Sequence, residues 1–231
     1  MPAEMSVDRS LRKLGDSGIA CFPVAHGCWR LGTTPVPSSL EKLESALEVG
    51  INLIDTADCY GGNGFGEAES LLGDVLASTP GLRERLVIAT KGGVVPGVPY
   101  DSSPEYLRSA AEASLKRLRI DVIDLYQIHR PDYLGHPARV ADVLSELRTA
   151  GKIRAAGVSN YTPAQFRALQ AHLDFPLVTH QPQFSCWHYA ALDDGVLDLC
   201  MERNLTPLAW SPLAMGKLGL DPSQAASDSW H

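Results

Sequence analysis

The feature of this sequence that most constrains its fold is a regular alternation of short apolar runs with segments of helical patterning. The apolar runs have the length of strands and lack the period-two alternation of a strand with one solvated face. They occupy residues 22–28, 51–55, 86–90, 121–128, 153–158, 177–181 and 206–210. Strands that alternate with helices and are covered on both faces indicate a parallel sheet joined by right-handed crossovers.

Several of the intervening helices have readable starts. Ser38 with Glu41 and Thr162 with Gln165 fit the spacing of a capping box, in which each side chain caps the other residue's backbone. Ser103 precedes a proline and opens a third helix. We therefore expect helices to begin close to these three positions.

Two α/β architectures fit this alternation, an open doubly wound sheet and a (β/α)8 TIM-type barrel. Strand starts recur about every 25 to 35 residues from end to end, which favours the barrel. No linker or composition break divides the chain, so we expect one domain over residues 1–231. The pattern yields about seven β/α units, and residues 221–231 form a small polar tail without an apolar run. We therefore expect an incomplete barrel that lacks the eighth strand.

The stretch INLIDTADCYGGNGFGEAE at residues 51–69 resembles the outline of a dinucleotide-binding loop, with a strand, a glycine-rich turn and a helix. The spacing does not match, because counting from Gly62 the third glycine of the G-x-G-x-x-G pattern would fall on Glu67. Glu67 and Glu69 would also place negative charge where a pyrophosphate would bind. We interpret the glycines as a flexible loop.

Chemically active side chains follow three successive strands instead. Asp55 ends one apolar run with Tyr60 close behind it, Lys91 ends the next run, and His129 follows the third. Each residue alone has an ordinary structural explanation, such as a solvated lysine or a turn-capping histidine. Because parallel strands deliver their carboxyl ends to one rim, where barrel active sites lie, the joint placement predicts a catalytic cluster.

These residue types suit the reduction of a carbonyl group. A tyrosine hydroxyl, with a pKa of about 10 in water, is a poor proton donor near neutral pH. We expect the charge of Lys91 to lower the pKa of Tyr60, and Asp55 to keep the lysine charged and oriented. His129 would hydrogen-bond the carbonyl oxygen and fix the substrate. Tyr60 would then protonate the developing alkoxide while a nicotinamide supplies the hydride.

Composition excludes several other classes of function. The net charge is −7 and no basic run occurs, so we expect neither nucleic acid nor an anionic membrane as a partner. No apolar stretch is long enough to span a membrane, and the N-terminus is too polar for a secretory signal. Five scattered cysteines indicate free thiols and a cytoplasmic location. We expect no metal site, since His180 and His188 lack carboxylate or thiol partners at ligand spacing.

From about residue 14 to 218 the sequence resembles the aldo-keto reductase superfamily. The resemblance is carried, in order, by NLIDTADCYGG, VIATKGG, DLYQIHRPD, AAGVSNYTPAQ and WSPLAMGKL. Its GCWRL and IHRPD segments are similar to a bacterial oxidoreductase branch, and WSPLA-G is similar to the β-subunits of potassium channels. The resemblance implies NAD(P)H-dependent reduction of an aldehyde or ketone, with Tyr60 as general acid, Asp55 and Lys91 tuning it, and His129 orienting the carbonyl.

The resemblance also implies a cofactor site, with NADP(H) preferred over NAD(H). Asp55 would lie at the border of this cofactor site. The other residues of the site would hold the carboxamide, stack on the nicotinamide, follow the pyrophosphate, or line the pocket for nicotinamide and substrate. They are Gly27, Cys28, Trp29, Ser159, Asn160, Gln181, Trp210, Ser211, Pro212, Leu213, Ala214 and Met215.

The departure from the superfamily lies after Lys217, where members continue into the eighth strand, the C-terminal helices and the residues that hold the adenosine phosphate. The resemblance therefore implies that the C-terminal helices are missing as well. An open barrel would expose two strand edges, which a homodimer contact could cover. Two alternatives to a working reductase therefore stay open. One is a non-catalytic accessory subunit that binds a nicotinamide nucleotide, and the other is a truncated, inactive reductase.

Overall fold

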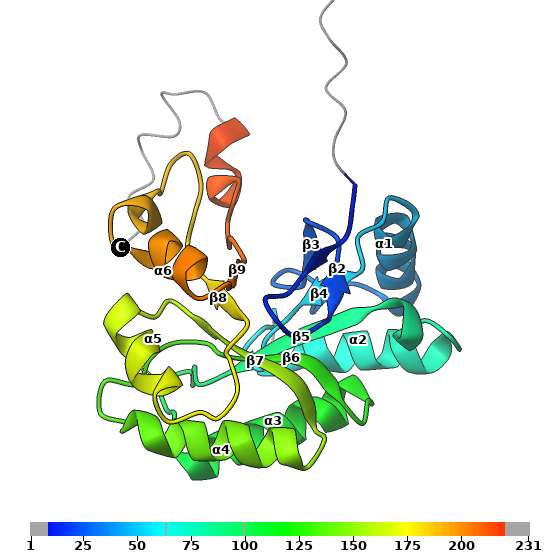
Figure 1. Ribbon diagram of the computed structural model, residues 1–231. Helices are drawn as coiled ribbons and strands as arrows, with labels where there is room; N and C mark the ends of the chain where they lie inside the picture. Colours follow the sequence, from blue (N-terminus) through cyan, green and yellow to red (C-terminus); the bar gives the residue numbers. More distant parts are fainter. Residues whose placement is uncertain (1–8, 63, 99, 220–231) are drawn as a thin grey trace, which may run out of the picture.

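The computed structural model describes residues 9–62, 64–98 and 100–219, and it contains one curled, seven-stranded parallel sheet with helices outside it (Figure 1). The strand order follows the chain, from β3 to β9. The strands are β3 (Ala25–Gly27), β4 (Leu53–Asp55), β5 (Val87–Gly92), β6 (Ile123–Ile128), β7 (Ile153–Ser159), β8 (Thr179–Gln181) and β9 (Thr206–Pro207). Each arises from one of the seven predicted apolar runs.

Helices follow the strands and cover the outer face of the sheet. They are α1 (Val36–Glu48), α2 (Glu67–Ser78), α3 (Pro104–Leu118), α4 (Pro137–Thr149), α5 (Pro163–Gln170) and α6 (Val196–Glu202), with short 3-10 turns η1 (Arg83–Arg85), η2 (Ala190–Leu192) and η3 (Ala214–Gly219). The larger apolar core lies between this layer and the sheet. Ile54, Ile88 and Tyr126 enter it from the outer face of successive strands, and Leu107 and Leu118 enter it from α3.

A second, smaller core fills the inside of the curled sheet near the strand starts. Leu53, Val87 and Leu125 point inward, out of phase with their outward-facing neighbours, as the pleat of a strand requires. A short antiparallel hairpin, β1 (Arg12–Lys13) with β2 (Ala20–Cys21), brings further apolar side chains, among them Leu14 and Ile19, against them. The hairpin closes the end of the barrel opposite the carboxyl ends of the strands.

The sheet does not close on itself within the described residues. β3 pairs with β4 and β9 pairs with β8, and neither has a second partner strand there. The side chain of Ala25, in β3, is correspondingly exposed. This arrangement confirms the expectation of an incomplete (β/α)8 barrel with seven strands. The predicted polar tail at 221–231 lies outside the described residues.

Two of the three predicted helix starts are confirmed. Ser103 accepts a hydrogen bond from the Tyr106 N–H at 3.2 Å, and Thr162 forms a complete capping box with Gln165. The prediction at Ser38 is wrong, because α1 begins two residues earlier, at Val36, without a side-chain cap. Pro37 explains the shift, since its fixed φ suits the first helical turn and lets the helix start ahead of the serine. No described helix combines the length and the apolar character needed to cross a membrane.

Candidate active site

The carboxyl ends of β4, β5 and β6 bring Asp55, Tyr60, Lys91 and His129 together, as the sequence predicts. Asp55 is the last residue of β4, and Tyr60 lies in the loop that follows it. Lys91 lies one residue before the end of β5. The backbone N–H of His129, just beyond β6, donates to the Gly92 carbonyl at 2.8 Å, which ties the histidine to the neighbouring strand.

Lys91 is the centre of this cluster. Its side chain is fully buried, and its Nζ donates to Asp55 Oδ2 at 2.8 Å and to the Thr56 carbonyl at 2.7 Å. The Tyr60 hydroxyl lies 3.5 Å from the same Nζ. Asp55 Oδ1 accepts a further hydrogen bond from Gln181 Nε2 at 3.1 Å, which links β4 to β8 across the barrel. A buried ammonium ion is thus held by a carboxylate and a carbonyl against a phenol.

Burial decides the protonation of the phenol. Burial raises the pKa of Tyr60, and the positive charge of Lys91 opposes this rise without cancelling it. Lys91 thus acts on the pKa of Tyr60 in the expected direction, but desolvation of the phenolate, which the sequence does not reveal, outweighs the ammonium ion. For Lys91, burial acts to lower the pKa, but Asp55 and Tyr60 together raise it above the usual value. At neutral pH the site holds a protonated tyrosine beside a charged lysine.

His129 is a neutral imidazole in this setting. Burial, followed by the charges of Lys91 and Arg130, lowers the pKa of His129 to about 3. Its ring centroid lies 5.8 Å from that of Tyr60 in an edge-to-face arrangement. A neutral imidazole can donate one hydrogen bond to an oxygen next to the tyrosine hydroxyl without competing for its proton.

The end of β3 provides the residues predicted to line the pocket. Trp29 is 61% exposed, and its ring packs edge to face against Tyr60 with centroids 4.9 Å apart. Gly27 ends the strand, and no atom lies within 4 Å of the position a Cβ would take there. Cys28 differs from both, since its side chain is fully buried in the apolar core and burial raises its pKa to about 12.

A hydrogen-bond network joins the predicted carboxamide residues to the predicted stacking residue. Ser159 ends β7 and its hydroxyl donates to the Gln181 carbonyl of β8 at 2.8 Å. Asn160 Nδ2 donates to Ser159 Oγ at 2.7 Å, and Asn160 Oδ1 accepts from the Trp210 indole Nε1 at 3.0 Å. The network fixes the half-buried indole of Trp210 beside polar strand ends. The guanidinium carbon of Arg130 lies 5.8 Å from its ring centroid.

The backbone of this region is unusual for non-glycine residues. Asn160 has φ 59°, Ser211 has φ 51°, Ala214 has φ 51° and Met215 has φ 57°, all in the left-handed region. Such conformations are costly and gather at ligand sites. Pro212 and Leu213 lie between them and are exposed.

Three further residues of the site escape prediction from sequence. Asp58 is fully buried, and its Oδ2 accepts a hydrogen bond from the Tyr106 hydroxyl of α3 at 2.8 Å. Burial raises the pKa of Asp58 to about 7. Cys59 Sγ lies 3.6 Å from His129 Nδ1. The sequence marks Asp58 as a turn residue close to Asp55. Its contact with Tyr106 gives no local signal, because that residue lies in a helix and is 48 residues further along the chain.

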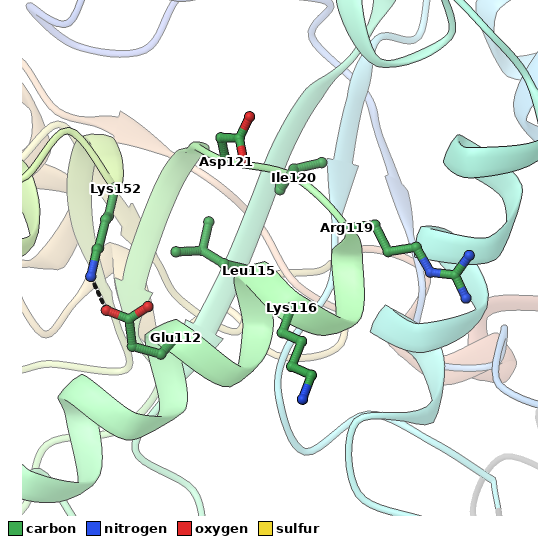
Figure 2. A pocket seen from close by; sticks show the side chains of 7 residues that line it. All are labelled: Glu112, Leu115, Lys116, Arg119, Ile120, Asp121 and Lys152. Atoms are coloured by element: carbon green, nitrogen blue, oxygen red, sulfur yellow. Dashed lines mark hydrogen bonds and ion pairs between the residues drawn. The ribbon is translucent and has the colours of Figure 1, made fainter.

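Two hollows lie away from this cluster, on the outer helices. Figure 2 shows one of them, beside the C-terminal half of α3 and the residues that follow it, where Lys152 forms an ion pair with Glu112. Its volume is about 430 Å³. It is lined by Glu112, Leu115, Lys116, Arg119, Ile120, Asp121 and Lys152. The other, of about 410 Å³, lies between α3 and α4. Neither contains a residue of the predicted site.

Comparison with known proteins identifies the family of the chain. Residues 23–228 match the model of the aldo/keto reductase family. A 6-dehydroglucose reductase from Novosphingobium aromaticivorans is 50% identical over 222 residues, which cover 94% of this chain and 73% of that protein. A protein of the same name from Agrobacterium fabrum is 36% identical, over 84% of this chain and 69% of its own length.

The solved structures lead to the same family. The structure of a glycerol dehydrogenase from Gluconobacter oxydans superposes with a TM-score of 0.81 at 32% identity, covering 96% of this chain and 68% of that one. A thermostable aldo-keto reductase superposes with a TM-score of 0.79 at 28% identity. The family model matches most of the chain, and one relative is 50% identical in sequence. The chain therefore belongs to the aldo/keto reductase family of oxidoreductases.

Proposed function

We propose that this protein reduces an aldehyde to an alcohol with a nicotinamide cofactor, and that Tyr60 is the general acid. The observation that carries the proposal is the position of the Tyr60 hydroxyl 3.5 Å from a fully buried Lys91 ammonium, which Asp55 holds at 2.8 Å. The hydroxyl is protonated at neutral pH, and the ammonium ion stabilises the phenolate that proton transfer leaves behind.

The substrate carbonyl would lie between Tyr60 and His129. The neutral imidazole of His129 donates a hydrogen bond to the carbonyl oxygen and orients it, and Tyr60 gives its proton to the same oxygen as the alkoxide forms. The reaction is balanced as R–CHO + NAD(P)H + H⁺ → R–CH₂OH + NAD(P)⁺. Lys91 keeps its own proton throughout, since the pKa of its ammonium is raised.

The residues at the ends of β7 to β9 fit a nicotinamide cofactor, which supplies the hydride when it is bound. Trp210 offers a half-buried aromatic face that Asn160 fixes in place, and Ser159 and Gln181 present polar groups beside it. The strained, left-handed backbone at Ser211, Ala214 and Met215 is of the kind found at ligand sites, and we propose that this segment follows the pyrophosphate. We propose NADP(H) in preference to NAD(H), and Gly27 and Trp29 as the pocket wall next to the nicotinamide.

For the substrate we propose 6-dehydroglucose, which reduction at C6 converts to glucose. Two relatives of that name, 50% and 36% identical to this chain, support the assignment. Trp29 is consistent with it, because an exposed indole beside the proton donor presents a flat apolar face to the C–H groups of a sugar ring.

Steady-state kinetics test the proposal. Oxidation of NADPH is followed by absorbance with 6-dehydroglucose, with unsubstituted aldehydes of similar length and without substrate. We expect aldehyde-dependent oxidation, with kcat/KM for 6-dehydroglucose at least about tenfold above that of the plain aldehydes. Turnover with every aldehyde alike would reject the sugar but keep the reductase. The absence of any aldehyde-dependent oxidation, in a folded sample that binds cofactor, would reject the reductase.

A titration of tryptophan fluorescence with NADPH and NADH tests the cofactor site separately. We expect saturable quenching at micromolar NADPH, a weaker response to NADH, and loss of most of the quenching in Trp210→Phe. Equal quenching in wild type and Trp210→Phe would show that the indole does not stack on the nicotinamide. The homodimer contact at the edges of β3 and β9 stays a prediction, which light scattering of the same sample tests.

A further inference from the structure

A group of potential metal ligands lies directly beside the proposed proton donor. Asp58, Cys59 and His129 each offer one ligand atom, and the three atoms lie within 4.8 Å of one another. It is the one group of three such side chains among the residues that the structure describes. We propose that these three side chains bind a divalent cation of the Zn²⁺ class, and that this cation inhibits the enzyme.

The distance between the two softer ligands already fits such an ion. Zinc bonds of about 2.3 Å to sulfur and about 2.05 Å to nitrogen, at the tetrahedral angle, place the two ligand atoms about 3.6 Å apart. Cys59 Sγ and His129 Nδ1 lie 3.6 Å apart. An ion can therefore bridge the thiol and the imidazole without a change in their separation, and only the carboxylate has to approach.

The third ligand, Asp58, has a free acceptor atom in a buried position. The residue has no solvent exposure, its Oδ2 accepts from the Tyr106 hydroxyl at 2.8 Å, and its Oδ1 has no hydrogen-bond partner among the described residues. An unpaired carboxylate oxygen in the interior costs free energy, and a metal bond would recover it. The hydrogen bond from Tyr106 would orient the ligating carboxylate from behind, as outer partners do in metal sites.

The donor set selects the class of ion. One sulfur, one imidazole nitrogen and one carboxylate oxygen suit Zn²⁺ or Co²⁺, whereas Mg²⁺ and Ca²⁺ require oxygen ligands. Three protein ligands leave the fourth tetrahedral position for water. As the sulfur–metal bond forms, the Cys59 thiol loses its proton to solvent. Glu69 adds negative charge near Asp58 and Cys59, whereas the positive charges of Lys91, Arg117 and Arg130 oppose the ion.

Binding of this ion does not depend on the proposed function, but its inhibitory effect does. An ion on His129 Nδ1 restrains the imidazole that orients the carbonyl. Its bonds to Asp58 and Cys59 also restrain the two residues that immediately precede Tyr60 in the loop. The expectation of no metal site considered only His180 and His188. His180 is fully buried and bonds the Tyr161 carbonyl at 2.8 Å, so it is not part of this group.

The test uses Co²⁺ as a spectroscopic probe on the full-length, reduced protein without substrate or cofactor. We expect one equivalent of Co²⁺ to bind with a thiolate-to-cobalt charge-transfer band in the near ultraviolet, and one equivalent of Zn²⁺ to displace it. Cys59→Val should abolish the band and weaken Zn²⁺ binding by at least about a hundredfold, while Asp58→Asn should weaken it by about tenfold. Cys186→Ser, which removes an exposed thiol, is the matched control and should change nothing.

Three outcomes would overturn the site. They are a charge-transfer band that persists in Cys59→Val, a band lost only in Cys186→Ser, and no stoichiometric binding of either metal. Circular dichroism confirms that each variant is folded, and Cys59→Ser replaces Cys59→Val if the valine variant unfolds. Kinetics then test the consequence, because Zn²⁺ should inhibit NADPH-dependent turnover of wild type and leave Cys59→Val resistant. Equal inhibition of both proteins would reject inhibition through this site.

Discussion

Replacing Lys91 with methionine tests the buried ion pair at the centre of the site. Methionine keeps most of the length and apolar volume of the lysine but removes three donated contacts, to Asp55 at 2.8 Å, to the Thr56 carbonyl at 2.7 Å and to the Tyr60 hydroxyl at 3.5 Å. It also leaves the Asp55 carboxylate without its counter-ion. Loss of stability and loss of turnover are therefore both expected, for separate reasons.

The size of the stability loss depends on the solvent exposure and the remaining hydrogen bond of the Asp55 carboxylate once Lys91 is replaced. Breaking a buried ion pair from one side costs about 3–5 kcal/mol in the free energy of unfolding. The Asp55 side chain is 16% exposed and keeps the hydrogen bond from Gln181 at 3.1 Å, so we expect the lower end of that range, about 3 kcal/mol. Since small domains are stable by about 5–15 kcal/mol, the variant should remain folded.

Urea denaturation of a double-mutant cycle measures this effect. Asp55→Asn in the Lys91→Met background removes the stranded charge, so the double variant should lose less stability than the sum of the single variants, by about 2 kcal/mol. Strictly additive losses would refute the ion pair as the cause.

The loss of unfolding free energy in Lys91→Met should be equal at pH 7 and pH 9. The pKa of Lys91 is raised in the folded protein, so its contribution is complete below the unfolded value of about 10.4 and is lost only as pH rises through the folded value. A deficit that shrinks between pH 7 and pH 9 would contradict the raised pKa.

Three further substitutions separate catalysis from packing. Tyr60→Phe removes the proton donor and should lower turnover on the order of 10²–10⁴-fold. Fluorescence titration should give an unchanged Kd for NADPH. Undiminished turnover would eliminate the mechanism. Asp124→Ala removes a buried carboxylate that accepts from Arg83 at 2.8 Å and from a backbone N–H, and urea denaturation should show a loss of about 3 kcal/mol with normal turnover at low urea. Gly157→Ala would place a Cβ 1.9 Å from Thr179 Oγ1 and 3.0 Å from the Thr179 carbonyl oxygen. Thermal unfolding should therefore report a loss of about 1–3 kcal/mol in the free energy of unfolding. An unchanged Tm would contradict the close packing of β7 on β8.

The sequence predicts the fold well where the signal is local. Seven apolar runs identify seven strands, because strands buried on both faces are mostly apolar along their length. Thr162 and Ser103 mark helix starts because capping is decided within four residues. The hairpin at Arg12–Lys13 and Ala20–Cys21 is missed, since two-residue strands leave no periodicity to read.

The site is predictable as far as strand order alone positions it. Asp55, Lys91 and His129 come together because parallel strands bring their carboxyl ends to one rim, which a single sequence can reveal. The pKa of Tyr60 is not predictable in this way, because its direction depends on how deeply the loop buries the phenol. The partners of Asp58 are also hidden, since Tyr106 reaches it from a separate helix and Cys59 meets His129 only through the fold.

Glu69 shows how a correct local interpretation can be incomplete. It lies in the first turn of α2, where a negative charge suits the helix dipole, as the sequence indicates. In the structure it is fully buried, accepts from the Thr90 hydroxyl at 2.5 Å and pairs with Arg117 at 2.6 Å. Its main contacts thus join α2 to β5 and α3, and no spacing within the helix could indicate them.

Isotope transfer tests the proposed carbonyl reduction most directly. The protein is incubated with 6-dehydroglucose and with NADPH that carries deuterium at C4 of the nicotinamide on one face or on the other, and the product is analysed by mass spectrometry. We predict an alcohol that gains one deuterium from only one of the two cofactors, at a rate that falls by at least about a hundredfold in Tyr60→Phe. An alcohol without deuterium from either cofactor, or no alcohol from a protein that binds NADPH, would contradict direct hydride transfer and the function proposed for this site.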